Sequence, residues 1–289
     1  MIKKFFASAI LLSLFMCVMF LTGCSDDSPA QIIVDPDATL TELPPIWDVP
    51  PRPDPENMAA DVTTNNLLQL TPLTRGELLV TMHTNMGDIV LRFFPTEAPK
   101  AVENFLTHAW DGYYDRLIFH RVIPDFMIQG GCSEGTGAAG QSIWGTPFAQ
   151  EFSTELRHFR GALAMAHAGP NTQGSQFYIV QNTNLASHFQ SDFIGWLETQ
   201  DEVMEEYPDG STITVGDVFP SASLRYFIDN GGVPHLDWHF NNNAHTVFGH
   251  VVSGMDVVDA IAATPTSNDR PVNDVIINGF TFHTYQGGS

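Results

Sequence analysis

The segment from Phe119 to Gly131 carries the residue types that are most informative about chemistry. This short β-patterned run holds one permanent cation, Arg121, one amide, Gln129, and two bulky apolar side chains, Phe126 and Met127. It offers no activated nucleophile, no standard set of metal ligands and no phosphate-binding loop. Such a set suits a reaction in which charge and shape are stabilised but no covalent bond is made or broken.

Two further segments follow in a recognisable order, Met165 to Thr172 and Gly174 to Tyr178. Together with the first segment they resemble a cyclophilin, a peptidyl-prolyl cis–trans isomerase. The uncatalysed rotation of the bond before proline faces a barrier of ~18–20 kcal/mol and takes tens to hundreds of seconds. A guanidinium that donates to the proline nitrogen only in the twisted state would lower that barrier, because the nitrogen lone pair becomes usable there.

The resemblance implies a role for each matching residue. Arg121 would be the electrostatic catalyst and Gln129 would orient it. The proline ring would lie against a pocket wall, with Phe248 as its floor, and main-chain groups would bind the substrate backbone. The wall residues are Phe126, Met127, Tyr178 and Leu236, the backbone-binding residues are Ala166 and His167, and Gln176 and His245 match beside them.

Departures from the family pattern lie mostly around residues 233–246. His235 stands where the family has the tryptophan that contacts cyclosporin, so we expect weak cyclosporin binding. The stretch from Trp238 to Ala244 is longer than the common pattern. Tyr178 replaces a common phenylalanine, which predicts a slightly more polar pocket.

Three other patterns favour ordinary structural roles. The run Gly135 to Gly140 spells a dinucleotide fingerprint, but no βαβ unit surrounds it. The spacing of His235, His239 and His245 matches no standard metal site. Nothing marks Cys132 as an activated thiol, and we expect a small structural residue. We therefore expect neither a metal nor a cofactor.

The elements that must position these residues are mainly β. Alternating apolar residues from Leu78 to Phe93, broken at Asn85–Gly87, predict a hairpin. Helices are predicted over 96–110 and 255–263. Further strands are expected at 117–123, 126–129, 162–167, 176–181, 246–252 and 274–285. About eight short strands with two capping helices indicate a closed antiparallel barrel of the cyclophilin-like kind.

Residues 182–233 interrupt that pattern as an insertion. An acidic helix is predicted from Phe189 to Tyr207, with Phe193, Trp196 and Val203 on its packing face. A helical excursion is favoured here because an unstructured loop of this length is uncommon in a domain.

The N-terminal region is organised differently. Lys3 and Lys4 precede an apolar run that ends at Cys24, which is typical of a secretory signal over residues 1–23. The tetrapeptide ending in Cys24 resembles a bacterial lipobox, so we expect cleavage before Cys24 and lipidation of its thiol; an uncleaved anchor is the alternative. Residues 24–75 are acidic and proline-rich and predict a tether, with a docking segment as the alternative. The isomerase domain is expected at 76–286.

The charge balance excludes some partners. With 12 basic and 33 acidic residues the formal net charge is −21, so nucleic acid is a poor partner. We expect a monomer that isomerises proline bonds in unfolded or exported polypeptides at a bacterial membrane surface. Two alternatives stay open: a catalytically weak proline-binding adaptor or chaperone on the same fold, and a metal-dependent activity at the 235–245 histidines.

Overall fold

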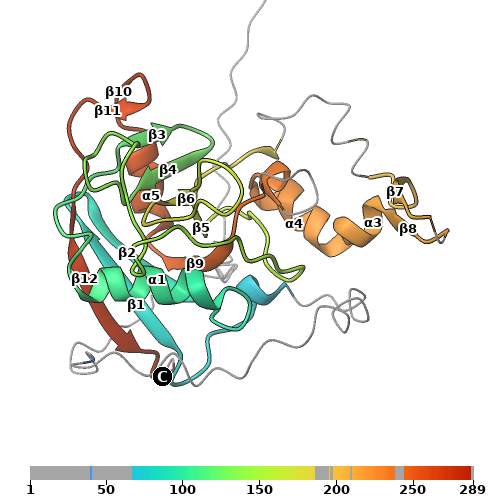
Figure 1. Ribbon diagram of the computed structural model, residues 1–289, viewed down its shortest axis with the longest axis horizontal. Coiled ribbons are helices and arrows are strands. Elements are labelled where there is room, and N and C mark those ends of the chain that lie inside the picture. Colours follow the sequence, from blue (N-terminus) through green and yellow to red (C-terminus); the bar gives the residue numbers. More distant parts are fainter. Residues whose placement is uncertain are drawn as a thin grey trace, which may run out of the picture. The chain divides into compact units, whose positions relative to one another are not determined.

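An eight-stranded antiparallel sheet forms the body of the protein (Figure 1). The computed structural model describes residues 40, 67–185, 195, 198–208, 210–237 and 244–287. The predicted signal, Cys24, almost all of the predicted tether, and His239 lie outside these residues. Among the described residues, no helix is both long and apolar enough to cross a bilayer.

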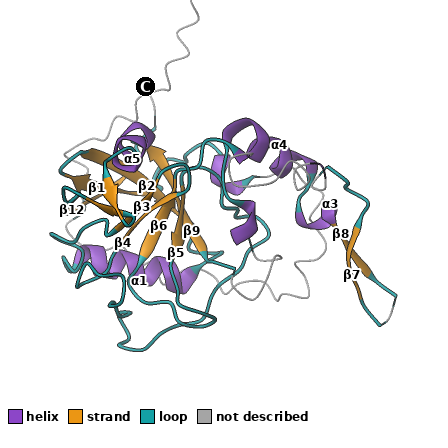
Figure 2. Ribbon diagram, turned by 90° about the horizontal axis from the view of Figure 1, so that it is seen from above, coloured by secondary structure: helices purple, strands orange, loops and turns teal. Residues whose placement is uncertain are grey.

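The strands of the main sheet follow the order β12-β1-β2-β9-β5-β6-β4-β3. Their bounds are β1 Leu78–Thr84, β2 Gly87–Phe93, β3 Arg121–Ile123, β4 Met127–Gly130, β5 Ala162–Met165, β6 Phe177–Val180, β9 Val247–Ser253 and β12 Ile277–Thr284. The two covering helices are α1, Pro99–Trp110, and α5, Met255–Ala262. They lie on opposite sides of the curled sheet, as Figure 2 shows. The hairpin and both helices are confirmed.

The predicted closed barrel is corrected to a strongly curled half-barrel. No ladder joins β3 to β12 among the described residues. The two edges approach through one isolated bridge, Ile118 with Ile276, and through single bonds such as Phe119 N–H to the Val275 carbonyl at 3.0 Å. The chain before β3 does not form a regular strand. The β3 and β12 edges are therefore joined only by isolated hydrogen bonds and not by a continuous ladder.

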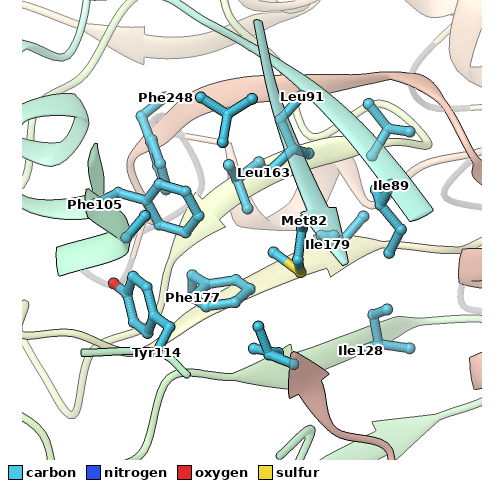
Figure 3. Close-up of a cluster of buried hydrophobic side chains, with 14 of the residues drawn as sticks. Met82, Ile89, Leu91, Phe105, Tyr114, Ile128, Leu163, Phe177, Ile179 and Phe248 are labelled. Atoms are coloured by element: carbon cyan, nitrogen blue, oxygen red, sulfur yellow. The ribbon is translucent and has the colours of Figure 1, made fainter. Parts of the chain in front are cut away.

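The inner face of the sheet holds the main core. Side chains from β1, β2, β4, β5 and β6 point toward one another and toward α1, as Figure 3 shows. Phe105 of α1 lies at the centre of this cluster, with its ring 5.1 Å from that of Phe177 and 5.4 Å from that of Phe248. Pro99 begins the helix, where a missing backbone donor costs nothing.

The insertion has its own small core, and the predicted helix from Phe189 to Tyr207 is wrong at residues 203–206. It contains a two-stranded sheet, β7 Val203–Glu206 with β8 Thr212–Thr214, and the helices α3 Val215–Val218 and α4 Ser221–Asn230. Residues 203–206 are therefore strand, and residues 186–194 and 196–197 lie outside the described residues. Phe227 of α4 packs on Phe159 with ring centroids 4.6 Å apart. The short helices η4 Leu68–Leu70 and η6 Pro234–Leu236 and the strands β10 Thr266–Ser267 and β11 Arg270–Pro271 complete the list.

Candidate active site

The outer face of three neighbouring strands brings the predicted catalytic and pocket residues together. Arg121 of β3 is paired with Gln129 of β4, and Gln129 is paired with Tyr178 of β6. Directly opposed residues in an antiparallel ladder share a face, so these three side chains form a row across the sheet. Their neighbours Val122 and Ile128 point to the inner core instead.

Arg121 is only loosely held. Its side chain is 45% exposed, and its Nη1 donates to Gln129 Oε1 at 3.4 Å. Its Nε lies 3.7 Å from Asp269 Oδ2, an ion pair between two exposed groups. A guanidinium has five N–H donors in a fixed fork, so most of them are not used by these contacts. Arg121 can therefore turn donors toward a bound peptide.

Gln129 is held in turn by Gln176. Gln129 Nε2 donates to Gln176 Oε1 at 3.0 Å. Gln176 Nε2 donates to the carbonyls of Gly137 and Ala139 at 2.9 and 2.8 Å. The glycine-rich loop thus holds Gln176, and Gln176 holds Gln129 in its orientation toward Arg121. The sequence identified this segment as a loop but predicted no such role for it.

A second apolar cluster lies on the same outer face of the sheet as Arg121 and Gln129. Its buried members are Phe94, Met127, Leu156, Ala162, Ala164, Tyr178, Val180, Val233 and Val247. Phe126, Ala166 and Leu236 are half-buried and pack against it. We refer to these twelve residues as the pocket cluster. It gathers the predicted ring-holding residues with one exception.

The exception is Phe248. Its side chain is fully buried in the main core, where its ring stacks on Phe93 at 6.4 Å. Figure 3 shows it beside Phe105, on the inner face. Phe248 therefore lies in the main core and not in the pocket cluster, where the family resemblance predicted it as the floor. Successive residues of a strand face opposite sides of the sheet, so the neighbour of Phe248, Val247, is the residue of β9 that belongs to the pocket cluster.

The Tyr178 hydroxyl does not make the pocket more polar in the way the sequence suggested. Its oxygen lies 2.9 Å from His158 Nε2, and His158 Nδ1 lies 2.6 Å from Asp237 Oδ1. Burial, and then the charge of Asp237, raise the pKa of Tyr178 well above its ordinary value. The hydroxyl thus stays protonated and is bound on its buried side.

His167 and His245 stack on each other with ring centroids 4.0 Å apart. His167 Nε2 lies 3.0 Å from the Ala244 carbonyl, and the Gly169 N–H lies 3.2 Å from its Nδ1. His245 Nδ1 lies 3.0 Å from the Met165 carbonyl. Burial, and then His167, lower the pKa of His245 to about 3, so it is neutral in ordinary buffers. The side chain of His167 is therefore engaged in the protein, and its main chain remains for a substrate.

A groove of ≈ 280 Å³ adjoins the glutamine pair. Its walls are the glycine-rich loop at 137–140, the segment Ala166–Ala168, and residues Gln129, Thr172 and Gly174–Gln176. Small residues dominate this lining, so an extended peptide backbone can approach closely. The predicted backbone-binding residues Ala166 and His167 lie on it.

Cys132 lies beside the run from Gly135 to Gly140 and is hydrogen-bonded to it. Cys132 is buried, and its sulfur accepts the Gly137 N–H at 3.2 Å within the glycine-rich loop. That loop leads into no helix. Across the part of the chain that is described, no three His, Cys, Asp or Glu residues are grouped closely enough to hold a metal ion.

The roles of three residues, His158, Asp237 and Asp269, were not found from the sequence. His158 and Asp237 are far apart in the chain and carried no spacing signal that would have paired them. Asp269, which faces Arg121, lies in the loop between β10 and β11, where its positive φ of 63° was not foreseeable from residue type alone.

The family pattern described as "Cyclophilin type peptidyl-prolyl cis-trans isomerase/CLD" matches residues 79–206 and 212–281, more than half of the chain. The chain belongs to this cyclophilin family. Its activity is accordingly peptidyl-prolyl cis–trans isomerisation.

Bacterial relatives of this cyclophilin are similar over most of their length. A Staphylococcus haemolyticus protein assigned as a peptidyl-prolyl cis-trans isomerase is 44% identical over 203 residues, which cover 70% of this chain and 89% of that protein. A Staphylococcus saprophyticus protein with the same assignment is 40% identical over 209 residues, covering 72% and 93%. The crystal structure of a Cryptosporidium parvum cyclophilin type isomerase aligns with a TM-score of 0.51 and 28% identity, covering 72% of this chain and 97% of that one. That protein was also solved in the presence of the dipeptide Ala-Pro, with a TM-score of 0.51 and 28% identity, covering 71% and 98%.

Proposed function

We propose that this cyclophilin isomerises Xaa-Pro bonds with Arg121 as the catalytic residue, Gln129 as its positioning residue, and the pocket cluster as the site of the proline ring. The observation that carries the proposal is the placement of a loosely held, half-exposed guanidinium on the same sheet face as the apolar pocket cluster, and bonded to Gln129, which lines the groove of ≈ 280 Å³. The Ala-Pro dipeptide used with the Cryptosporidium relative supports a proline-containing substrate.

The proposed chemistry needs only differential stabilisation. In the planar ground state the proline nitrogen lone pair is delocalised, and in the twisted state it becomes an acceptor. A donor from Arg121 stabilises only the second state, so it raises the turnover rate and leaves ground-state binding unchanged. One such pre-positioned charged donor contributes about 2.7–4 kcal/mol, or 10²–10³ in rate.

The test is the exchange rate of a Xaa-Pro peptide, followed by NMR, with the full chain and its Arg121→Ala variant. We expect kcat to fall about 10²–10³-fold with KM nearly unchanged. Arg225→Ala is the matched control, because Arg225 is an exposed arginine of α4 in the insertion. Retention of full kcat in Arg121→Ala would exclude this residue as the catalyst.

The alternative of a proline-binding adaptor on the same fold has one observation in its favour. His235 stands at the family's tryptophan position, and its ring stacks on that of Phe126 with centroids 6.1 Å apart, so the surface beside the pocket cluster differs from the family pattern. An adaptor would bind proline peptides equally well with and without Arg121 and would show no catalysed exchange in either form. The same substitution leads us to expect cyclosporin inhibition only well above nanomolar concentrations.

For the cellular setting we propose a lipid anchor on Cys24 and a role in folding exported proteins at an extracytoplasmic bacterial membrane surface. The support is the basic start, the apolar run and the Leu21-Thr22-Gly23-Cys24 ending of the signal-like segment. Two or more acyl chains hold a protein on a membrane durably, since each buried methylene contributes ~0.8 kcal/mol. Expression of the full chain with labelled palmitate should label the wild type and not Cys24→Ser. Equal labelling of both would exclude this anchor.

A further inference from the structure

Three buried side chains form a hydrogen-bonded chain behind the pocket cluster. The Tyr178 hydroxyl oxygen lies 2.9 Å from His158 Nε2, and His158 Nδ1 lies 2.6 Å from Asp237 Oδ1. The same carboxylate oxygen accepts the backbone N–H of His158 at 2.8 Å. The side chains of His158 and Asp237 are each 1% exposed. The chain thus joins β6, the loop before β5 and the segment after η6.

The donor and acceptor capacity of each group indicates where the protons lie in the Tyr178–His158–Asp237 hydrogen bonds. An ionised carboxylate only accepts, so the proton of His158 lies on Nδ1 and is donated to Asp237. In the form of the ring with its single proton on Nδ1, Nε2 accepts from the Tyr178 hydroxyl. That hydroxyl is therefore committed to His158 and offers no donor to a substrate.

The backbone around His158 is also held by contacts that do not involve Tyr178 or Asp237. Gln69 bonds both the N–H and the carbonyl of Arg157, at 2.7 and 2.9 Å. The His158 carbonyl accepts the N–H of Val233 at 2.8 Å, and Phe159 pairs with Gly232 in an isolated bridge. His158 is therefore a fixed point to which Tyr178 and Asp237 are both bonded.

These contacts connect two walls of the pocket cluster. Tyr178 belongs to its buried part, and Leu236, the neighbour of Asp237, packs against it from a different segment. We propose that His158 and Asp237 are positioning residues that set the separation of Tyr178 and Leu236, and hence the affinity for a proline-containing peptide. The proposal rests on the assignment of the pocket cluster as the proline site. Arg121 is not part of the hydrogen-bonded chain, so turnover of bound peptide is preserved when the chain is broken.

The test measures kcat and KM for a Xaa-Pro peptide in Tyr178→Phe and Asp237→Ala. Tyr178→Phe keeps the ring and removes only the hydroxyl. KM is expected to rise about tenfold in both, the equivalent of ~1.4 kcal/mol, with kcat within about twofold of the wild type. Asp237→Asn keeps an acceptor for His158 Nδ1–H and is expected to restore most of the wild-type KM.

Tyr114→Phe is the matched control. The Tyr114 hydroxyl is equally buried and donates to the Ser175 carbonyl at 3.0 Å, but Tyr114 belongs to the main core. Its loss should lower thermal stability without changing KM. A second readout is the ¹H NMR signal of the His158 Nδ1 proton, expected far downfield in the wild type and absent in Asp237→Ala.

The outcomes separate the two proposals. If the KM values of Tyr178→Phe and Asp237→Ala match that of Tyr114→Phe, the positioning role is overturned, and it is equally overturned if kcat falls while KM stays constant. Arg121→Ala is measured alongside. Loss of kcat in that variant with an unmoved KM in Tyr178→Phe removes only the positioning role, whereas full kcat in Arg121→Ala removes the catalytic assignment itself. If Asp237→Ala does not fold, Tyr178→Phe and Asp237→Asn decide the matter.

Discussion

Replacement of Gln129 by leucine is the sharpest probe of how Arg121 is oriented. Leucine has a similar size but removes both polar contacts of Gln129, the 3.4 Å bond from Arg121 and the 3.0 Å bond to Gln176. Gln176 keeps its two bonds to the glycine-rich loop, so the groove should retain its shape. The remaining described polar partner of Arg121 is then Asp269, 3.7 Å away.

The two effects of Gln129→Leu differ in size. Two hydrogen bonds of ~0.5–1.5 kcal/mol each are lost, so stability should fall by about 1–3 kcal/mol. The guanidinium is free to move toward Asp269, and a displacement of about 1 Å at a reacting centre can cost up to 10² in rate. We expect kcat to fall about 10–100-fold with KM nearly unchanged, because no residue of the pocket cluster is altered.

A second substitution tests the cause. Asp269→Asn removes the competing charge and is compatible with the positive φ of 63° at this residue, since asparagine tolerates that region well. Alone it should change kcat by about twofold or less, because exposed ion pairs contribute ~0–1 kcal/mol. In the Gln129→Leu background it should recover part of the lost kcat. NMR exchange of a Xaa-Pro peptide measures all four forms. The reasoning is refuted if Gln129→Leu keeps the wild-type kcat, or if it raises KM alone.

Three further predictions concern stability, which urea unfolding measures, and the second of them also concerns KM, which the Xaa-Pro exchange assay measures. Burial, and then Arg92, lower the pKa of His250 to about 3, so the unfolded chain binds more protons at this residue between pH 6.5 and 3. His250 therefore makes unfolding easier by ~1.4 kcal/mol per pH unit as pH falls through that window; His250→Gln should remove this contribution and leave that of His245, whose pKa is lowered to a similar value. Phe248→Leu should cost ~1–3 kcal/mol without raising KM, whereas its outward neighbour Val247→Ala should raise KM; the reverse pattern would contradict the assigned faces. Gly231→Ala should destabilise by ~1–3 kcal/mol, because φ is +86° and the new Cβ would lie 2.3 Å from the Asn182 carbonyl oxygen; an unchanged midpoint would contradict this.

The elements predicted correctly from sequence are those whose pattern is visible within a short stretch of chain. The hairpin of β1 and β2 and the helix from Pro99 were predicted because strand alternation and helical spacing are visible within a few turns of chain. The row of Arg121, Gln129 and Tyr178 was predicted as a set by the family resemblance, but its shared face became evident only from the strand register.

The errors occurred where long-range contacts decide the outcome. Val203–Glu206 has helical spacing, yet it pairs with Thr212–Thr214, and the turn between them is marked by Pro208 and Gly210, a signal that should have argued against a helix. Phe248 was assigned to the pocket from its motif, although alternation along β9 sends its side chain into the core. The pairing of His158 with Asp237 spans 79 residues and has no local signature.

The site combines a loosely held catalyst with a tightly held pocket. Arg121 is 45% exposed and makes contacts of 3.4 and 3.7 Å, whereas the groups behind Tyr178 are buried and bonded at 2.6 to 2.9 Å. The exposed guanidinium keeps donors available for a bound peptide while Gln129 sets its direction, and a proline ring is held best by walls that do not move. Changes along the path from Gln176 to Arg121 should therefore act on kcat, and changes along the path from His158 to Leu236 should act on KM. Gln129 and Tyr178 lie opposite each other on β4 and β6, so the independent pair to combine is Gln129→Leu with Asp237→Ala, whose side chains share no hydrogen-bond partner among the described residues; that double variant should lose activity by the product of the two single effects.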